Sequence, residues 1–164
     1  MNLAGEVALV TGAGKGIGRA IAQALADLGV AVAVNSFHEK SARAACEELT
    51  EAGSRACAVP ADVNDEAAVR KMVQHATAEL GPIDILVNNA AAPAEFVPFV
   101  ETTAEIREQE MVTFTGVLNC TRHVLEDMVA RRSGRVINIS SIGARYTCVG
   151  RAVYGAAMGP GLKS

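Results

Sequence analysis

A glycine-rich turn near the start of the chain has the residue types and the spacing to bind an anion. It reads Thr11-Gly12-Ala13-Gly14-Lys15-Gly16-Ile17-Gly18, between an apolar run at 7–10 and a segment with helical spacing. Glycines leave backbone N–H groups uncovered, and the first turn of a helix adds unpaired N–H groups and the positive end of the helix dipole. Because a phosphate group fits such a helix start, we predict a nucleotide pyrophosphate site here.

The spacing of these glycines departs from the dinucleotide fingerprint. That fingerprint is G-x-G-x-x-G, whereas Gly12, Gly16 and Gly18 give G-x-x-x-G-x-G. A glycine turn can also serve only to pack a strand against a helix. The position of this turn, after the first predicted strand and at the start of the first predicted helix, favours nucleotide binding over packing alone.

The end of the second predicted strand indicates which dinucleotide would bind. A domain that prefers NAD usually has an acidic residue there, which binds the ribose 2′-hydroxyl. This chain has Asn35, Ser36 and His38 instead, so no carboxylate repels a 2′-phosphate. Lys15 in the turn and Lys40 nearby add positive charge, although both could also be solvated surface charges. We therefore predict NADP(H) in preference to NAD(H).

The elements that would position these residues alternate between strand and helix patterns. Short apolar, β-branched runs suit strands buried on both faces, and we predict strands at 7–10, 30–34, 56–59, 83–87 and 136–139. Alternation with helices implies right-handed crossovers and a parallel sheet. We predict a three-layer, Rossmann-type, doubly wound α/β domain with strand order 3-2-1-4-5. Two details follow from periodicity and capping: Asn64 caps the third helix, and a long fourth helix over about 103–132 buries Phe114, Val117, Leu118, Thr121, Leu125 and Met128.

Composition limits the partners. The chain has 164 residues, half of them apolar, and a net charge of −3. One domain over 1–164 is expected from this length, and there is no basic field for nucleic acid. The four cysteines lack metal-ligand spacing, which favours reduced thiols and no metal site. With no secretory signal and no run of about 18 apolar residues, we expect a cytoplasmic protein with no membrane partner.

Several motifs resemble those of the short-chain dehydrogenase/reductase family, in the family's order. Thr11–Gly18 resembles its T-G-x-x-x-G-I-G cofactor motif, and Asp62-Val63 resembles the pair that contacts the adenine. Asn88-Asn89-Ala90-Ala91 resembles the N-N-A-G motif after the fourth strand. Ser141 resembles the serine after the fifth strand, and Tyr154 follows it at the family's usual spacing. The resemblance spans residues 3–158 and is closest to 3-oxoacyl-carrier-protein reductases and related alcohol dehydrogenases.

The resemblance implies hydride transfer between a nicotinamide and a carbonyl or alcohol carbon of a small molecule, such as a 3-oxoacyl thioester. Tyr154 would be the general acid or base, and Ser141 would hold the substrate oxygen. The implied cofactor contacts are Gly12, Gly14, Lys15, Gly16, Ile17, Gly18, Asn35, Ser36, His38, Asp62, Val63, Asn88 and Ala90.

Three positions depart from the family pattern. Met158 stands where the family has a lysine, four residues after Tyr154, and Thr113 stands where it has a relay asparagine. Ala91 replaces the last glycine of N-N-A-G, and an added methyl group there could crowd the cofactor. A cation beside a phenol favours the phenolate, and acid–base catalysis typically contributes about 10²- to 10⁴-fold. We therefore expect impaired catalysis.

The family also continues beyond this point with a longer helix and two more strands. Here Pro160 between two glycines cannot sustain a helix, so we expect an incomplete domain whose fifth strand is a sheet edge. Three hypotheses stay open. They are an NADP(H)-dependent carbonyl reductase, a non-catalytic dinucleotide-binding pseudoenzyme that associates with other subunits through the long fourth helix, and a truncated fragment without an independent role.

Overall fold

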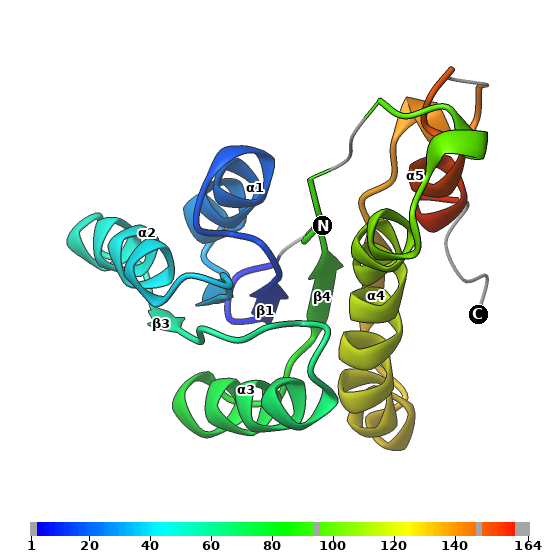
Figure 1. The fold of residues 1–164 in the computed structure, drawn as a ribbon. Coiled ribbons are helices and arrows are strands. Elements are labelled where there is room, and N and C mark those ends of the chain that lie inside the picture. The colour runs from blue at the N-terminus through cyan, green and yellow to red at the C-terminus, as the bar shows by residue number, and fades with distance from the viewer. Residues whose placement is uncertain (1–2, 94–95, 147–148, 160–164) are drawn as a thin grey trace.

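The computed structural model describes residues 3–93, 96–146 and 149–159. Its centre is a five-stranded sheet with helices on both faces (Figure 1), in the predicted order β3-β2-β1-β4-β5. Every neighbouring pair is parallel, and in the register Leu9 of β1 lies opposite Ala33 of β2 and Leu86 of β4. The strands are β1 (Val7–Val10), β2 (Ala31–Val34), β3 (Ala56–Ala58), β4 (Ile85–Asn88) and β5 (Arg135–Asn138).

The helices form the two outer layers. Those on one face are α1 (Gly16–Asp27) and α2 (Glu39–Glu51), and those on the other are α3 (Glu66–Leu80) and α4 (Ala104–Arg131). A short helix, α5 (Ala152–Ala157), packs against α4 (Figure 1). Two 3-10 turns complete the described elements, η1 (Phe99–Glu101) and η2 (Ile142–Ala144).

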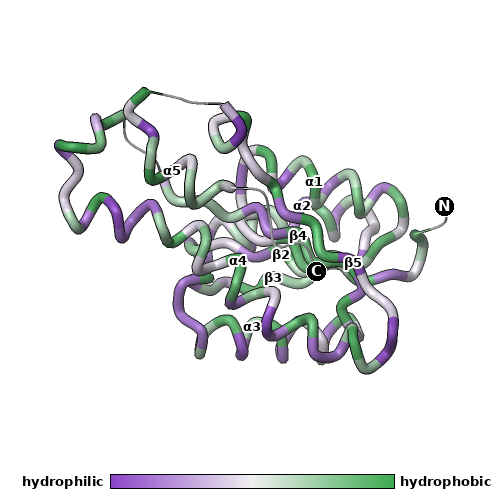
Figure 2. Tube along the Cα trace, turned by 90° about the vertical axis from the view of Figure 1, so that its right-hand side faces the viewer, coloured by the Kyte–Doolittle hydropathy of each residue, from purple (hydrophilic) through white to green (hydrophobic). Residues whose placement is uncertain are grey.

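Apolar side chains fill both faces of the sheet. Leu9 and Leu86 point into the layer under α3 and α4, whereas Val10 and Val87 point into the layer under α1 and α2. Side chains alternate between the faces of a strand, so a strand covered on both sides needs a continuous apolar run. In Figure 2 the strands at the centre are hydrophobic, and the helices around them alternate between polar and apolar residues.

The predicted buried face of the long helix was wrong at two of its six positions, whereas Met128 is buried as predicted. Phe114 and Leu118 are 37% and 40% exposed. Gly116 faces inward so closely that a Cβ there would lie 2.6 Å from the Cγ2 atom of Val63. At this point the helix turns a residue without a side chain inward, which allows it to approach the loop after β3. Its buried residues are Glu110, Thr113, Gly116, Cys120, Val124 and Met128.

The predicted cap of the third helix was also off by one residue. Asp65 is the N-cap of α3, and its Oδ1 accepts hydrogen bonds from the N–H groups of Ala67 at 2.9 Å and Ala68 at 3.1 Å. The backbone N–H of Asn64 instead donates to Oδ1 of Asp62, at 2.8 Å. Asparagine and aspartate can both cap a helix. The turn in which Asp62 accepts the N–H of Asn64 leaves Asp65 as the residue that caps α3.

Among the described strands, β5 lies at an edge of the sheet, as expected. Arg135 and Ile137 are exposed there. Beside this edge lies a groove of about 360 Å³ whose apolar lining includes Leu125, Met128 and Val136. Pro160 and Cys148 lie outside the described residues. Across the described ranges, no helix is long and apolar enough to cross a membrane.

Candidate functional site

The turn between β1 and α1 is fastened to the segment after β4. The hydroxyl of Thr11 accepts hydrogen bonds from the N–H groups of Asn89 at 2.9 Å and Ala90 at 3.0 Å, and it lies 3.3 Å from the carbonyl oxygen of Val87, to which it donates. The side-chain amide of Asn89 donates back to the carbonyl oxygen of Thr11, at 3.0 Å. Two loops far apart in sequence therefore form one rigid unit at the carboxyl ends of adjacent strands.

The glycines of the turn serve two different purposes. A Cβ on Gly18 would lie 2.4 Å from Nδ2 of Asn89, and one on Gly12 would lie 2.9 Å from Cα of Ala90. A Cβ on Gly14 would lie 2.8 Å from the side chain of Ser36. These three positions must be glycine for packing. Gly12 and Gly16 both have a positive φ, +64° and +57°. Gly16 differs from the other three because nothing lies within 4 Å of the place where its Cβ would stand, so its backbone borders open space.

The backbone donors in the second half of the turn are unpaired among the described residues. Within the described part of the chain, no hydrogen-bond acceptor is found for the N–H groups of residues 14–18, and the N-cap Lys15 makes no side-chain cap. Lys15, Gly16 and Ile17 are exposed, with Ile17 at 68%. An exposed apolar side chain beside free N–H groups at a helix start fits a ligand that has both a phosphate and an apolar part.

The residues at the end of β2 support this turn from the side. The amide of Asn35 is buried, and its Oδ1 accepts the N–H of Gly12 at 3.3 Å. Its Nδ2 donates to the carbonyl oxygens of Val59 at 3.0 Å and Ala61 at 3.2 Å. The Asn35 side chain is thereby committed to holding the turn. Ser36 lies against Gly14, whereas His38 is exposed at the N-cap of α2.

The candidates after β3 and β4 border the same edge of the sheet. Asp62 is half-buried, and Val63 is buried against Gly116 of α4. The side-chain amide of Asn88 donates to Oγ1 of Thr121 at 3.1 Å and to Oδ1 of Asn138 at 2.8 Å. Its Oδ1 is buried without a partner in the described residues, which leaves one acceptor free beside β5. Ala90 is half-buried next to the turn.

The structure brings Ser141 and Tyr154 together. Ser141 is the N-cap of η2, and its Oγ accepts the N–H of Gly143 at 3.2 Å. A Cβ on Gly143 would lie 3.6 Å from this Oγ and 3.7 Å from the ring of Tyr154 on α5. The hydroxyl of Ser141 and the ring of Tyr154 therefore both lie within van der Waals distance of one point beside Gly143.

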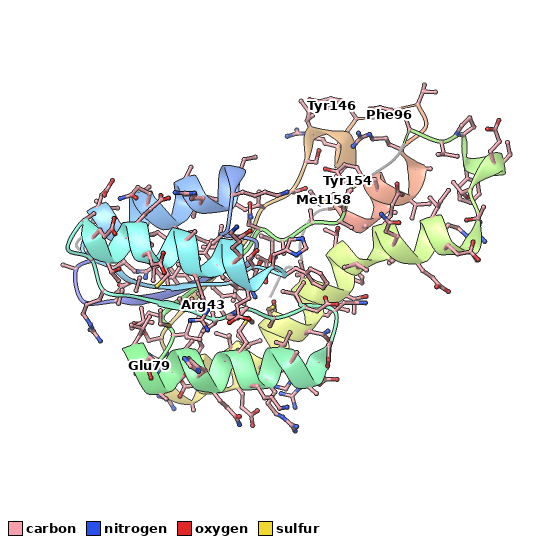
Figure 3. The ribbon with its side chains drawn as sticks, turned by 60° about the vertical axis from the view of Figure 1, so that its left-hand side comes forward. Arg43, Glu79, Phe96, Tyr146, Tyr154 and Met158 are labelled. Carbon is pink, nitrogen blue, oxygen red and sulfur yellow. The ribbon has the colours of Figure 1, made fainter. Side chains whose placement is uncertain are left out.

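The structure also places the residues that were predicted to depart from the family pattern. Met158 follows Tyr154 by one helical turn (Figure 3), and its carbonyl oxygen accepts the hydroxyl of Ser140 at 2.5 Å. The buried hydroxyl of Thr113 accepts the N–H of Ala92 at 3.1 Å, so it holds the loop after β4. The asparagine nearest in sequence, Asn119, does not take the place of the relay asparagine. Its side-chain amide donates to the carbonyl oxygen of Val63 at 3.0 Å.

The substitution at Ala91 needs no special backbone conformation. Among the described residues other than glycine, only Arg132 has a positive φ. Ala91 is exposed and adopts angles that any L-residue allows. The methyl group therefore causes no backbone strain in place of the family's glycine.

Two residues of the site gave no signal in the sequence. The guanidinium of Arg151 stacks on the ring of Phe96, with 3.8 Å from its carbon to the ring centroid, and it lies 5.0 Å from the centroid of Tyr154. The loop after β4 and the segment before α5 meet only in the folded chain. A guanidinium next to the candidate tyrosine could not be inferred from spacing.

The cysteines that the structure describes take no part in this arrangement. Burial raises the pKa of Cys57 and of Cys120 to about 12, so both thiols stay protonated near neutral pH. Within ranges 3–93, 96–146 and 149–159, no three His, Cys, Asp or Glu side chains gather as a metal site would require.

A parallel sheet in this order, with a glycine turn between β1 and α1 at its carboxyl edge, defines a Rossmann-like α/β protein. Comparison with known families makes the assignment narrower. The family model described as short chain dehydrogenase matches residues 6–159. The chain therefore belongs to the short-chain dehydrogenase family.

Individual relatives agree with the family. An uncharacterized oxidoreductase of Methylorubrum extorquens is 42% identical over 160 residues, which are 96% of this chain and 63% of the relative. The 3-oxoacyl-[acyl-carrier-protein] reductase of Staphylococcus aureus is 37% identical over 90% of this chain and 60% of its own length.

A solved structure is similar over nearly the whole chain. It is a gluconate 5-dehydrogenase from Burkholderia cenocepacia, determined in complex with NADP and tartrate. It has a TM-score of 0.90 and 33% identity, covering 96% of this chain and 62% of that protein. The chain thus spans less than two thirds of the length of each of these proteins.

Proposed function

We propose that this chain is the dinucleotide-binding part of an oxidoreductase that transfers hydride between NADP(H) and a carbonyl or alcohol substrate of the 3-oxoacyl kind. The observation that carries the proposal is the set of unpaired N–H groups over residues 14–18, next to the open space at Gly16. Ser141 and Tyr154, which meet around Gly143, support the catalytic half of the proposal.

The residues present fit this cofactor. The backbone N–H groups of the turn would bind the pyrophosphate, since its glycines leave these donors uncovered and the space next to Gly16 is empty of protein atoms. The exposed residues Lys15 and His38 and the half-buried Ser36 offer a cation, an imidazole and a hydroxyl for a 2′-phosphate. NADP in the similar gluconate 5-dehydrogenase supports the same preference. The remaining contacts would come from Gly12, Gly14, Ile17, Gly18, Asp62, Val63, Asn88 and Ala90. Asn35, whose amide is already engaged, would hold the turn in place.

The bound nicotinamide would supply or accept the hydride, and the protein would handle the proton. In reduction, the Tyr154 phenol donates its proton to the carbonyl oxygen as negative charge develops there. The hydroxyl of Ser141 donates a hydrogen bond to the same oxygen, and the N–H of Gly143 fixes the direction of that hydroxyl. Correctly placed acid–base groups of this kind contribute about 10²- to 10⁴-fold to a rate.

Two observations favour slow turnover and keep a non-catalytic role as the second candidate. Met158 places a thioether one turn from Tyr154, where a cation would favour the phenolate. The hydroxyl of Thr113 is already engaged by Ala92. The open edge at β5 and the apolar groove beside it support a role in association with other subunits.

Binding and turnover measured on one preparation test the proposal. A fluorescence titration with NADPH should saturate, and NADH should bind at least tenfold more weakly. NADPH oxidation with an acetoacetyl thioester should be slow and should fall further in Tyr154→Phe. Absence of saturable NADPH binding would overturn the proposal. Saturable binding with no turnover that depends on Tyr154 would select the non-catalytic alternative.

A further inference from the structure

Arg151 occupies an unusual position beside the candidate tyrosine. Its guanidinium carbon lies 3.8 Å from the ring centroid of Phe96 and 5.0 Å from that of Tyr154. Figure 3 shows Phe96, Tyr146 and Tyr154 gathered at one end of the molecule, where the loop after β4 meets the segment before α5. Cation–π contacts of this kind hold a guanidinium plane against a ring.

The backbone fixes this stack. The N–H of Val97 donates to the carbonyl oxygen of Gly150 at 2.9 Å, and this bond joins the two segments directly beside Phe96 and Arg151. Gly150 has a φ of +75°, and a Cβ there would lie 3.3 Å from the backbone of Phe96 and Val97. A residue with a side chain is therefore disfavoured by both conformation and space. The close approach of these two backbone segments places Arg151 against the ring of Phe96.

The guanidinium has no hydrogen-bond or ion-pair partner in the described part of the chain. Its Nε is buried and unsatisfied, although the residue as a whole is only half-buried. Leaving a buried donor unpaired is energetically unfavourable, and such groups in native proteins usually have a partner. Because the ring covers the face of the guanidinium, its N–H groups point along the plane. That geometry matches the two oxygens of a carboxylate.

We propose that Arg151 anchors the carboxylate of a short oxo or hydroxy acid, whose carbonyl or alcohol group then faces Tyr154 and Ser141. The inference rests on the proposed oxidoreductase function and makes the free acid, rather than its thioester, the preferred form of the substrate. A thioester of the same carbon skeleton has no charge at its acyl carbon for a guanidinium to bind. The rings of Phe96 and Tyr146, 68% and 61% exposed, offer apolar surface to the carbon chain.

Calorimetric titration of the full chain tests this assignment directly. The probes are acetoacetate and its uncharged analogue acetoacetamide, each titrated with and without saturating NADPH. The variants are Arg151→Met, which keeps an apolar stem over Phe96, and Arg151→Lys, which keeps the charge without the planar fork. Arg145→Met is the matched control, because Arg145 also lies near a tyrosine, 5.9 Å from the centroid of Tyr146, but is exposed.

Acetoacetate should bind to the unaltered chain at least tenfold more tightly than acetoacetamide. Arg151→Met should lose at least tenfold in acetoacetate affinity, Arg151→Lys should lose less, and Arg145→Met should lose nothing. Equal affinity for acid and amide, no binding of acetoacetate, or full acetoacetate affinity in Arg151→Met would each overturn the assignment. If Arg151→Met does not fold, as judged by circular dichroism, the acid–amide comparison and Arg151→Lys decide.

The NADPH titration separates this inference from the proposed function. Saturable NADPH binding combined with no preference for the acid would defeat the carboxylate anchor alone. Arginine-dependent acetoacetate binding in a chain that fails to bind NADPH would support the anchor while defeating the cofactor proposal.

Discussion

Replacing Gly18 by alanine separates the packing role of the glycine turn from its role in binding. The new Cβ would lie 2.4 Å from Nδ2 of Asn89 and 2.4 Å from the carbonyl oxygen of Gly12. The oxygen belongs to backbone whose N–H is tied to Asn35, so it has little freedom to move. The amide of Asn89 must then leave its bonds to Thr11 and Gly12, or the start of α1 must shift.

The magnitude follows from three contributions. Overpacking of this kind costs about 1–3 kcal/mol, and loss of a hydrogen bond from the Asn89 amide costs about 1 kcal/mol. The better helix propensity of alanine offsets about 1 kcal/mol of this. A net loss of about 2 kcal/mol in the free energy of unfolding corresponds to a fall of about 6 °C in Tm for a chain of this size.

Binding should suffer more than stability. Displacement of the helix start moves the unpaired N–H groups of residues 14–18 away from the phosphate position. We expect NADPH affinity to fall at least tenfold at 25 °C, measured by fluorescence titration alongside thermal unfolding. Gly53→Ala is the matched control. Gly53 has a φ of +87° and nothing within 4 Å, so the variant should lose about 1–2 kcal/mol to left-handed strain and keep its NADPH affinity. Unchanged NADPH affinity in Gly18→Ala would refute the reasoning.

Three further changes test other parts of the structure. Met158→Lys should raise the rate of NADPH oxidation at least tenfold, because a cation one turn from Tyr154 favours the phenolate, whereas Met158→Leu should not. Asp84 accepts a strand N–H at 3.0 Å and Arg131 at 2.9 Å, so Asp84→Ala should lower the free energy of unfolding in urea by about 2 kcal/mol; an unchanged midpoint would contradict this. Burial raises the pKa of Cys120 to about 12 from 9.0, so the folded chain keeps a proton that the unfolded chain releases. Stability should therefore be intact below pH 9 and decline above it by up to about 1.4 kcal/mol per pH unit, and urea midpoints at pH 8 and pH 10.5 should differ less in Cys120→Ala.

Local patterns were sufficient to predict the sheet. The runs that contain Leu9 and Leu86 had to be covered on both faces, and alternation with helices left a parallel order as the expectation. The inward face of α4 could not be predicted in this way. Gly116 and Thr113 are buried because the helix approaches Val63 and the loop at Ala92 closely, and neither residue type is apolar enough to mark a buried face.

The candidate site also has features that local sequence patterns could predict and features that they could not. The spacing of the glycine turn was sufficient to predict a strand, a turn and a helix, and the distance from Ser141 to Tyr154 along the chain was sufficient to nominate both. Which glycines must lack a side chain for packing depends on Asn89 and Ser36, which approach from other strands. The same holds for Asn35, whose amide is committed to the backbone around it.

By itself, the sequence determined the α/β architecture. It also predicted an anion site at the turn and the lack of a cation at Met158, because each depends on neighbours along the chain. Only the tertiary structure decided that Thr11 joins the turn to Asn89 and that Ser141 and Tyr154 meet beside Gly143. It also decided that Arg151 stacks on Phe96 with no hydrogen-bond partner among the described residues. These contacts form between segments that are distant along the chain, and their geometry is set by the sheet and by close backbone approach at glycines. Residue type and spacing along the chain do not indicate where two backbone segments approach each other closely.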